Sequence, residues 1–280
     1  MIRIIDTVSE MSDEAARIKA GGKTIGVVPT MGYFHEGHLS LMRRSVKEND
    51  FTIVTLFVNP TQFGPKEDLE RYPRDLERDL KLAGETGADV LFTPDNKSMY
   101  PEGYKTYVTV EEWSKQLCGN SRPIHFRGVT TVCLKLFNIC RSDRAYFGLK
   151  DAQQYLIINK MVRDLNLNME VVPNPTVREQ DGLAMSSRNV YLTPEQRQAA
   201  LLINKSLTEA KESINSGRTD AKHLISSILG TLGESPSIRI DYVEAVCTET
   251  LMPVQEIKSG TLIAVAAYLG ETRLIDNLIV

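Results

Sequence analysis

The feature that most constrains the fold is an alternation of short apolar runs with longer amphipathic runs, which continues to about residue 172. The short runs are rich in β-branched and aromatic residues at successive positions, which is typical of strands covered on both faces of a parallel sheet. We expect strands at residues 24–28, 51–58, 89–92, 145–148 and 169–172, and helices at 39–49, 69–86, 129–140 and 152–165. This alternation predicts an α/β fold built on a doubly wound parallel sheet.

The pattern changes near Pro173 and Pro175, and we expect a smaller α+β domain after it. Thr193 followed by Pro194 is typical of a helix start. We expect helices from there to about residue 215 and over 220–232, and strands at 238–246, 261–268 and 272–277. Gly270 and Glu271 are a plausible hairpin turn between the last two strands.

Charge and composition exclude several function classes. The 280 residues include 33 Lys and Arg against 36 Asp and Glu, so the net charge is -3. A protein built to hold nucleic acid usually carries a basic excess, and docking on an anionic membrane needs clustered basic residues. No apolar run approaches the roughly 20 residues that span a bilayer. The start lacks a signal peptide and the four cysteines lack paired spacing, so we expect a cytoplasmic protein.

Two of the four histidines lie in the loop after the first predicted strand, which reads PTMGYFHEGH over residues 29–38. We expect the next helix to begin at about Gly37. A helix N-terminus favours phosphate, and the imidazoles of His35 and His38 could hydrogen-bond phosphate oxygens there. The pattern is neither GxGxxG nor a P-loop. The alternatives are a histidine pair satisfied within a capping turn, or a chance metal site.

Other polar groups follow later strands, where ligands of such sheets bind. Asn59 and Gln62 could orient a carboxylate or hydroxyl ligand, although Asn-Pro also begins ordinary turns. Lys150 supplies a positive charge suited to phosphate. Asp151 could simply cap the next helix, and Gln154 would project from its first turn.

Three further segments leave two interpretations open. Residues 181–189 form a small polar loop that could clamp a triphosphate through its serines and arginine, or could be an interdomain linker. Residues 125–129, HFRGV, could gate a site or simply begin a helix. Asp75 and Asp79 fit a solvated helix face better than a magnesium site, although carboxylates do accompany magnesium beside phosphates.

Taken together, these segments resemble a known family. HxGH is similar to the HIGH motif of the nucleotidyltransferase superfamily, and MSSRN is similar to its KMSKS loop. More closely, nearly the whole chain resembles the pantoate–β-alanine ligase (pantothenate synthetase) family. The segments that carry the resemblance are PTMGYFHEGHLSLM (29–42), FVNPTQFGPKEDLERYPR (57–74), HFRGVTTVCLKLFN (125–138), YFGLKDAQQ (146–154) and DGLAMSSRNVYL (181–192). Leu149 departs from the polar or acidic residue expected in many relatives, outside the ligand positions.

The resemblance implies a Rossmann-like nucleotide-binding domain over residues 1–174 and a smaller lid domain over residues 175–280. It also implies a two-step reaction: pantoate and ATP form pantoyl adenylate and pyrophosphate, and β-alanine then displaces AMP to give pantothenate. ATP and Mg²⁺ are expected, with Asp79 the candidate metal ligand, and a homodimer is carried over from the family.

The implied residue roles follow the matching motifs. The catalytic group is His38, as proton donor, with His35, Lys150, Ser186, Ser187 and Arg188. The implied ATP contacts are Met31, Gly32, His35, Gly37, His38, Gly148, Leu149, Lys150, Asp151, Val177, Met185, Ser186, Ser187 and Arg188. Gln62 and Gln154 are implied to bind pantoate, and Gln62 also to touch β-alanine.

Two other functions remain open. A cytidylyltransferase-like enzyme would share HxGH but would transfer a nucleotide to a phosphorylated substrate, for which the neutral Gln62 and Gln154 are poorly suited. A non-catalytic nucleotide-binding or RNA-binding module is disfavoured by the acidic charge balance, and steeply salt-dependent RNA binding would revive it.

Overall fold

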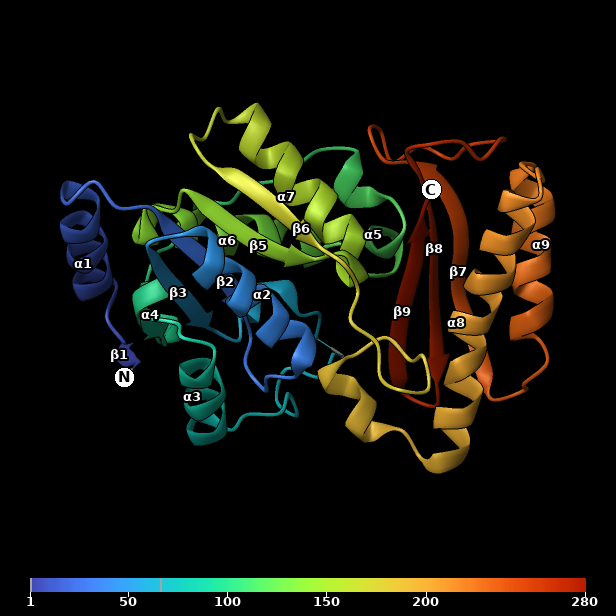
Figure 1. Ribbon diagram of the computed structural model, residues 1–280, viewed down its shortest axis with the longest axis horizontal. Coiled ribbons are helices and arrows are strands. Elements are labelled where there is room, and N and C mark those ends of the chain that lie inside the picture. Colours follow the sequence, from blue (N-terminus) through green and yellow to red (C-terminus); the bar gives the residue numbers. More distant parts are fainter. Residues whose placement is uncertain (1, 66) are drawn as a thin grey trace.

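The computed structural model describes residues 2–65 and 67–280, and a six-stranded parallel sheet forms its larger part (Figure 1). The strands are β1 (Arg3–Ile5), β2 (Ile25–Thr30), β3 (Phe51–Leu56), β4 (Val90–Phe92), β5 (Arg144–Gly148) and β6 (Glu170–Asn174), in the order β1-β4-β3-β2-β5-β6. The five expected strands are present. The sixth, β1, was not predicted because three residues at the sheet edge carry little periodic signal.

Helices cover both faces of this sheet, as a parallel sheet requires. Val27 packs in a core with helices on one face, and its neighbour Val28 packs in a separate core on the other. Helices α1 (Val8–Ala20), α6 (His125–Cys140) and α7 (Ala152–Asp164) contribute to the first core. Helices α2 (Glu36–Glu48) and α3 (Leu76–Glu85) contribute to the second. Short helices α4 (Asn96–Met99) and α5 (Cys118–Ser121) lie in the connections.

Two predicted helix starts were wrong. Residues 69–75 are not helical, because α3 begins after Asp75, whose carboxylate accepts the N–H of Arg78 at 3.1 Å as an N-cap. Helix α6 begins at His125, four residues before the predicted start. None of the helices in residues 2–65 and 67–280 is long and apolar enough to cross a membrane.

The C-terminal part is a three-stranded antiparallel sheet in the order β7-β8-β9. Its elements are α8 (Pro194–Asn215), α9 (Ala221–Leu232), β7 (Ile238–Cys247), β8 (Thr261–Leu269) and β9 (Thr272–Ile279). Along β8, Ile263 and Val265 pack in a core shared with α8 and α9, whereas Leu262 and Ala264 join the core of the parallel-sheet part. This sheet therefore lies between its own two helices and the rest of the molecule (Figure 1).

The order of the parallel sheet locates its switch point. The chain runs outward from β2 through β3 and β4, then returns to place β5 on the other side of β2. The carboxyl ends of β2 and β5 are therefore neighbours, and the crevice between them is where sheets of this type bind ligands.

Candidate active site

A cavity of about 210 Å³ lies at this switch point. It is bounded by the turn after β2, the loop after β3, the turn after β5 and the segment after β6. The predicted site residues that line it are Met31, His35, Gly37, His38, Gln62, Gly148, Lys150, Asp151, Gln154, Val177, Met185, Ser186, Ser187 and Arg188. Gly32, Leu149 and Asp79 are not among the residues that line it.

His35 and His38 lie at the N-terminus of α2, and the centroids of their two rings are 4.1 Å apart. The Nδ1 atom of His35 accepts the N–H of Gly37 at 3.1 Å, and Nδ1 of His38 accepts the N–H of His35 at 3.4 Å. Since each Nδ1 is an acceptor, each neutral ring carries its proton on Nε2. The histidines thus cap the helix, as the alternative interpretation expected, and both also line the cavity.

Both imidazoles are neutral near pH 7. Burial, with a smaller contribution from the nearby Lys150, lowers the pKa of His35 to about 4. Burial also lowers the pKa of His38 well below its usual value, with smaller contributions from His35 and Lys150. The two Nε2–H groups can therefore donate hydrogen bonds to a ligand without an imidazolium ion having formed.

Asp79, the candidate metal ligand, has a structural role in the turn after β2. Its side chain is fully buried, and its carboxylate accepts the backbone N–H groups of Tyr33 and Phe34, the latter at 2.7 Å. Gly32 and Tyr33 both have positive φ angles, +90° and +53°, so the turn needs this anchor. The interpretation of Asp79 as part of a solvated helix face is wrong, because the residue is buried.

Gln62 is held from two sides. Its Oε1 atom accepts the amide of Asn59 at 3.0 Å, which directs Nε2 toward Met31 in the cavity wall. Asn59 is 1% exposed and also donates to the carbonyl of Gly128 at 3.1 Å. A Cβ on Gly128 would lie 2.6 Å from the backbone of Gln62, so only glycine allows this approach of α6. Asn59 is therefore a positioning residue, and not only a turn residue.

The turn after β5 is an irregular 3-10 segment, Leu149–Asp151, that presents Lys150 to the cavity. The Nζ atom of Lys150 lies 4.0 Å from the carboxylate of Asp151. The expected helix cap by Asp151 is wrong, because its side chain makes no capping hydrogen bond to α7. Asp151 instead lines the cavity beside Lys150.

The Ser-Ser-Arg segment closes one side of the cavity and contacts the loop after β3. Arg188 donates two hydrogen bonds to Asp68, at 2.9 and 3.0 Å, and Ser187 lies 3.3 Å from the hydroxyl of Tyr72. Tyr72 also lines the cavity and was not predicted as a site residue. Its only sequence signal was a Tyr-Pro-Arg motif beside a charged segment.

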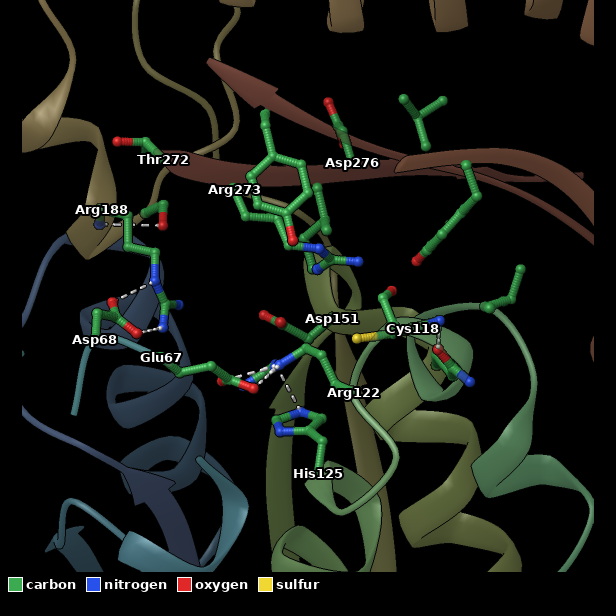
Figure 2. A pocket seen from close by; sticks show the side chains of 18 of the residues that line it. Glu67, Asp68, Cys118, Arg122, His125, Asp151, Arg188, Thr272, Arg273 and Asp276 are labelled. Atoms are coloured by element: carbon green, nitrogen blue, oxygen red, sulfur yellow. Dashed lines mark hydrogen bonds and ion pairs between the residues drawn. The ribbon is translucent and has the colours of Figure 1, made fainter. Parts of the chain in front are cut away.

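A larger cavity of about 1070 Å³ adjoins the first and extends toward the antiparallel sheet (Figure 2). Lys150, Asp151, Gln154, Ser186 and Arg188 line both cavities.

Buried polar groups form one wall of this larger cavity. Arg122 pairs with Glu67 and donates to Nε2 of His125 at 3.2 Å, so Nδ1 of His125 donates to the Gln62 carbonyl at 3.0 Å. His125 thus begins a helix, as one interpretation held. Arg122 was not predicted, because a single arginine in a loop has no motif around it.

Comparison with known proteins agrees with this geometry. The sequence model of the family described as Pantoate-beta-alanine ligase matches residues 3–279. The chain is 57% identical over 279 residues to a pantothenate synthetase of Acetivibrio thermocellus, covering 100% of this chain and 99% of that one. The crystal structure of pantothenate synthetase from Thermus thermophilus is 46% identical, with a TM-score of 0.94 and 99% of both chains covered.

A more distant solved structure was determined with ligands. It is the pantoate–β-alanine ligase of Francisella tularensis, described as complexed with β,γ-ATP and β-alanine, and it is 33% identical with a TM-score of 0.80. It covers 100% of this chain and 98% of that one. The family match over almost the full length, the high identity to curated relatives and the shared fold lead to one conclusion: this chain belongs to the pantoate–β-alanine ligase family.

Proposed function

We propose that this pantoate–β-alanine ligase condenses its substrates through pantoyl adenylate, at the junction of the two cavities. The observation that carries the proposal is the convergence of the His35/His38 turn, Lys150 and the Gln62 amide on a single cavity. The first two supply donors for phosphate, and the third supplies a neutral group for an organic acid. A catalyst of adenylate formation needs both beside each other.

In the first step a pantoate carboxylate oxygen attacks the α-phosphorus of ATP, and the bond to the bridging oxygen of pyrophosphate breaks. Negative charge grows on the phosphates, so donors fixed in advance lower the barrier. We assign the Nε2–H groups of His35 and His38, the ammonium of Lys150 and the Ser186–Arg188 segment to these oxygens. The implied role of His38 as a proton donor would need an imidazolium ion. Because His38 is neutral, we assign it instead as a hydrogen-bond donor.

We assign pantoate to the smaller cavity, which Gln62 lines. The wall there is apolar, formed by Phe57, Val129, Val132 and Leu136, and it suits the dimethyl carbon of pantoate. Gln62 and Gln154 can orient the carboxylate and hydroxyls as neutral donors. A neutral amide does not neutralise the pantoate carboxylate, so the carboxylate keeps its nucleophilicity. A lysine at the same place would reduce that nucleophilicity.

In the second step the amine of β-alanine attacks the acyl carbon, AMP leaves with the bonding pair, and the amine loses a proton. We place the entry of β-alanine in the larger cavity, from which it would reach Gln62 in the wall of the smaller one. Residues 175–280 then act as the lid that keeps water from the adenylate, with residues 1–174 as the nucleotide-binding domain.

Magnesium is the expected companion of ATP, but Asp79 does not fit it. Both oxygens of that carboxylate are engaged by backbone N–H groups. Among the described residues, no three His, Cys, Asp or Glu side chains lie together as a metal site. We therefore assign no protein ligand to magnesium. A homodimer remains a proposal carried from the family, and a cytoplasmic location remains an expectation from the sequence.

Isotope exchange tests the intermediate. With labelled pyrophosphate and unlabelled ATP, label should enter ATP when pantoate is present and β-alanine is absent, because the first step is reversible. Exchange that requires β-alanine would mean that the amine takes part before pyrophosphate leaves. A cytidylyltransferase-like enzyme would instead exchange label with CTP and a phosphorylated substrate.

A further inference from the structure

The last strand of the small sheet reaches the turn that presents Lys150. The side-chain amide of Asn277, on β9, donates to the backbone carbonyl of Leu149 at 2.8 Å and to that of Lys150 at 2.9 Å. A side-chain amide has two N–H groups. The Asn277 amide nitrogen is thus bonded to two consecutive carbonyls of the Leu149–Asp151 turn, across the boundary between residues 1–174 and 175–280.

The turn depends on such support because its own conformation is irregular. It lies between the end of β5 and the start of α7, and Asp151 has φ and ψ angles of -97° and 52°, outside the helical region. Asp151 makes no capping hydrogen bond, so the first turn of α7 does not fix the preceding residues in the usual way. The direction of the Lys150 side chain follows from the orientation of these peptide units.

The residue next to Asn277 anchors the other loop of the site. Asp276 is 3% exposed and accepts two hydrogen bonds from Arg178, at 2.6 and 3.0 Å. Arg178 also donates to the carbonyl of Gly182 at 3.1 Å, at the base of the loop that leads to Ser186. Consecutive residues of β9 therefore hold the Lys150 turn and the Ser-Ser-Arg loop.

We propose that Asn277 is a positioning residue for adenylate formation, which sets Lys150 at the phosphates by clamping the two carbonyls of its turn. The proposal rests on the assignment of Lys150 to ATP. The proposal gives residues 175–280 a second role. Besides covering the site, they would position Lys150 for adenylate formation. Asp276 extends the same support to the Ser-Ser-Arg loop.

The test measures pantoate-dependent release of pyrophosphate, with substrate affinities, in wild type and Asn277 variants. Two hydrogen bonds of ordinary strength correspond to a loss of roughly tenfold to hundredfold in kcat/KM for ATP. We expect that loss in Asn277→Ala, with the KM for pantoate within about twofold of wild type. Asn277→Asp keeps the shape but removes the donors, so it should lose as much or more. A near-normal Asn277→Asp enzyme would overturn the proposal, since packing alone would then suffice.

A double-mutant cycle separates positioning from a general structural role. If Asn277 acts through Lys150, Asn277→Ala should cause little further loss in a Lys150→Ala background, measured in single turnovers at high enzyme concentration. An equal fold-loss in both backgrounds would overturn the proposal.

Ser121→Ala is the matched control. It removes a 3.0 Å hydrogen bond to Asp241 that also joins the two parts of the chain but involves no group of the Leu149–Asp151 turn. It should leave the kcat/KM for ATP unchanged, and a loss equal to that of Asn277→Ala would contradict the specific role. If wild type itself releases no pyrophosphate with pantoate, the proposed function fails. If wild type is active and Asn277→Ala matches it, only the role of Asn277 fails.

Discussion

Arg188 and Asp68 form a two-bond ion pair that joins the Ser-Ser-Arg loop to the loop after β3, where the cavities meet (Figure 2). Both side chains are less than a third exposed. A carboxylate occupies the two parallel N–H groups that a phosphate would use. The Asp68 carboxylate would therefore compete with the triphosphate of ATP for the guanidinium group of Arg188.

Removing this competitor should strengthen ATP binding. Asp68→Asn keeps the size of the side chain but weakens the ion pair, so we expect the KM for ATP to fall about three- to fivefold, equivalent to roughly 1 kcal/mol. Initial rates at saturating pantoate measure it. Glu271→Gln, which breaks the exposed pair with Arg71, is the control and should have no effect. A higher KM in Asp68→Asn would show that Asp68 instead orients Arg188 for ATP.

Gly128→Ala should damage the pantoate site through the backbone. The new methyl group would lie 2.5 Å from the Thr61 carbonyl oxygen and 2.6 Å from Gln62, so the Gln62 segment must move. We expect the KM for pantoate to rise about tenfold with little change for ATP, and overpacking to cost roughly 1–3 kcal/mol of stability. Gly230→Ala, in α9 with open space around it, should be neutral or slightly stabilising. Equal loss of affinity for both substrates would contradict this account.

Stability should fall as the pH drops from about 6.5 to 4. His35 has a folded-state pKa of about 4 against an ordinary value of 6.5, so in this window the unfolded chain binds a proton that the folded chain does not. This lowers the free energy of unfolding by up to about 3 kcal/mol. Urea unfolding at several pH values should show a shallower pH slope for His35→Asn. Equal pH slopes for the variant and the wild type would contradict the lowered pKa of His35 in the folded protein.

Asp79→Asn should destabilise the turn without altering the response to magnesium. The variant has one acceptor oxygen for two N–H groups, and its own NH₂ would face a donor, at a cost of about 1–3 kcal/mol. Asp75→Asn is the matched control, because asparagine caps helices as well as aspartate does. Thermal unfolding and magnesium titrations of activity measure the two effects. A shifted magnesium requirement with unchanged stability would restore the metal-ligand role.

The sequence predicted the fold well where burial is two-sided and continuous. Strands such as β3, with four consecutive buried residues, stand out because the apolar run is short and rich in β-branched residues, whereas helices are longer. The first predicted strand is too short at its carboxyl end. It stopped before Pro29, yet β2 continues to Thr30, because its pairing with β5 ends at Val27 and the missing N–H at Pro29 leaves no bond unmade there.

The site was predictable where a motif follows a strand, and less so where partners come from distant segments. His35, His38 and Lys150, which line one cavity, were predicted from their positions after strands. The side chains that hold the loops of the site, Asp79, Asp68 and Asn277, lie 45 to 128 residues along the chain from the groups they bind. No local pattern marks such a contact, because its energy depends on the three-dimensional packing that the whole fold creates.

The most direct test of the account is a rapid-quench experiment with enzyme, ATP and pantoate at comparable concentrations and β-alanine omitted. Adenylate formation predicts a burst of about one pyrophosphate per active site with almost no free AMP, followed by stoichiometric AMP and pantothenate when β-alanine is added. Pyrophosphate release that begins only on addition of β-alanine, or AMP release that keeps pace with pyrophosphate without it, would contradict the protected pantoyl adenylate on which the account rests.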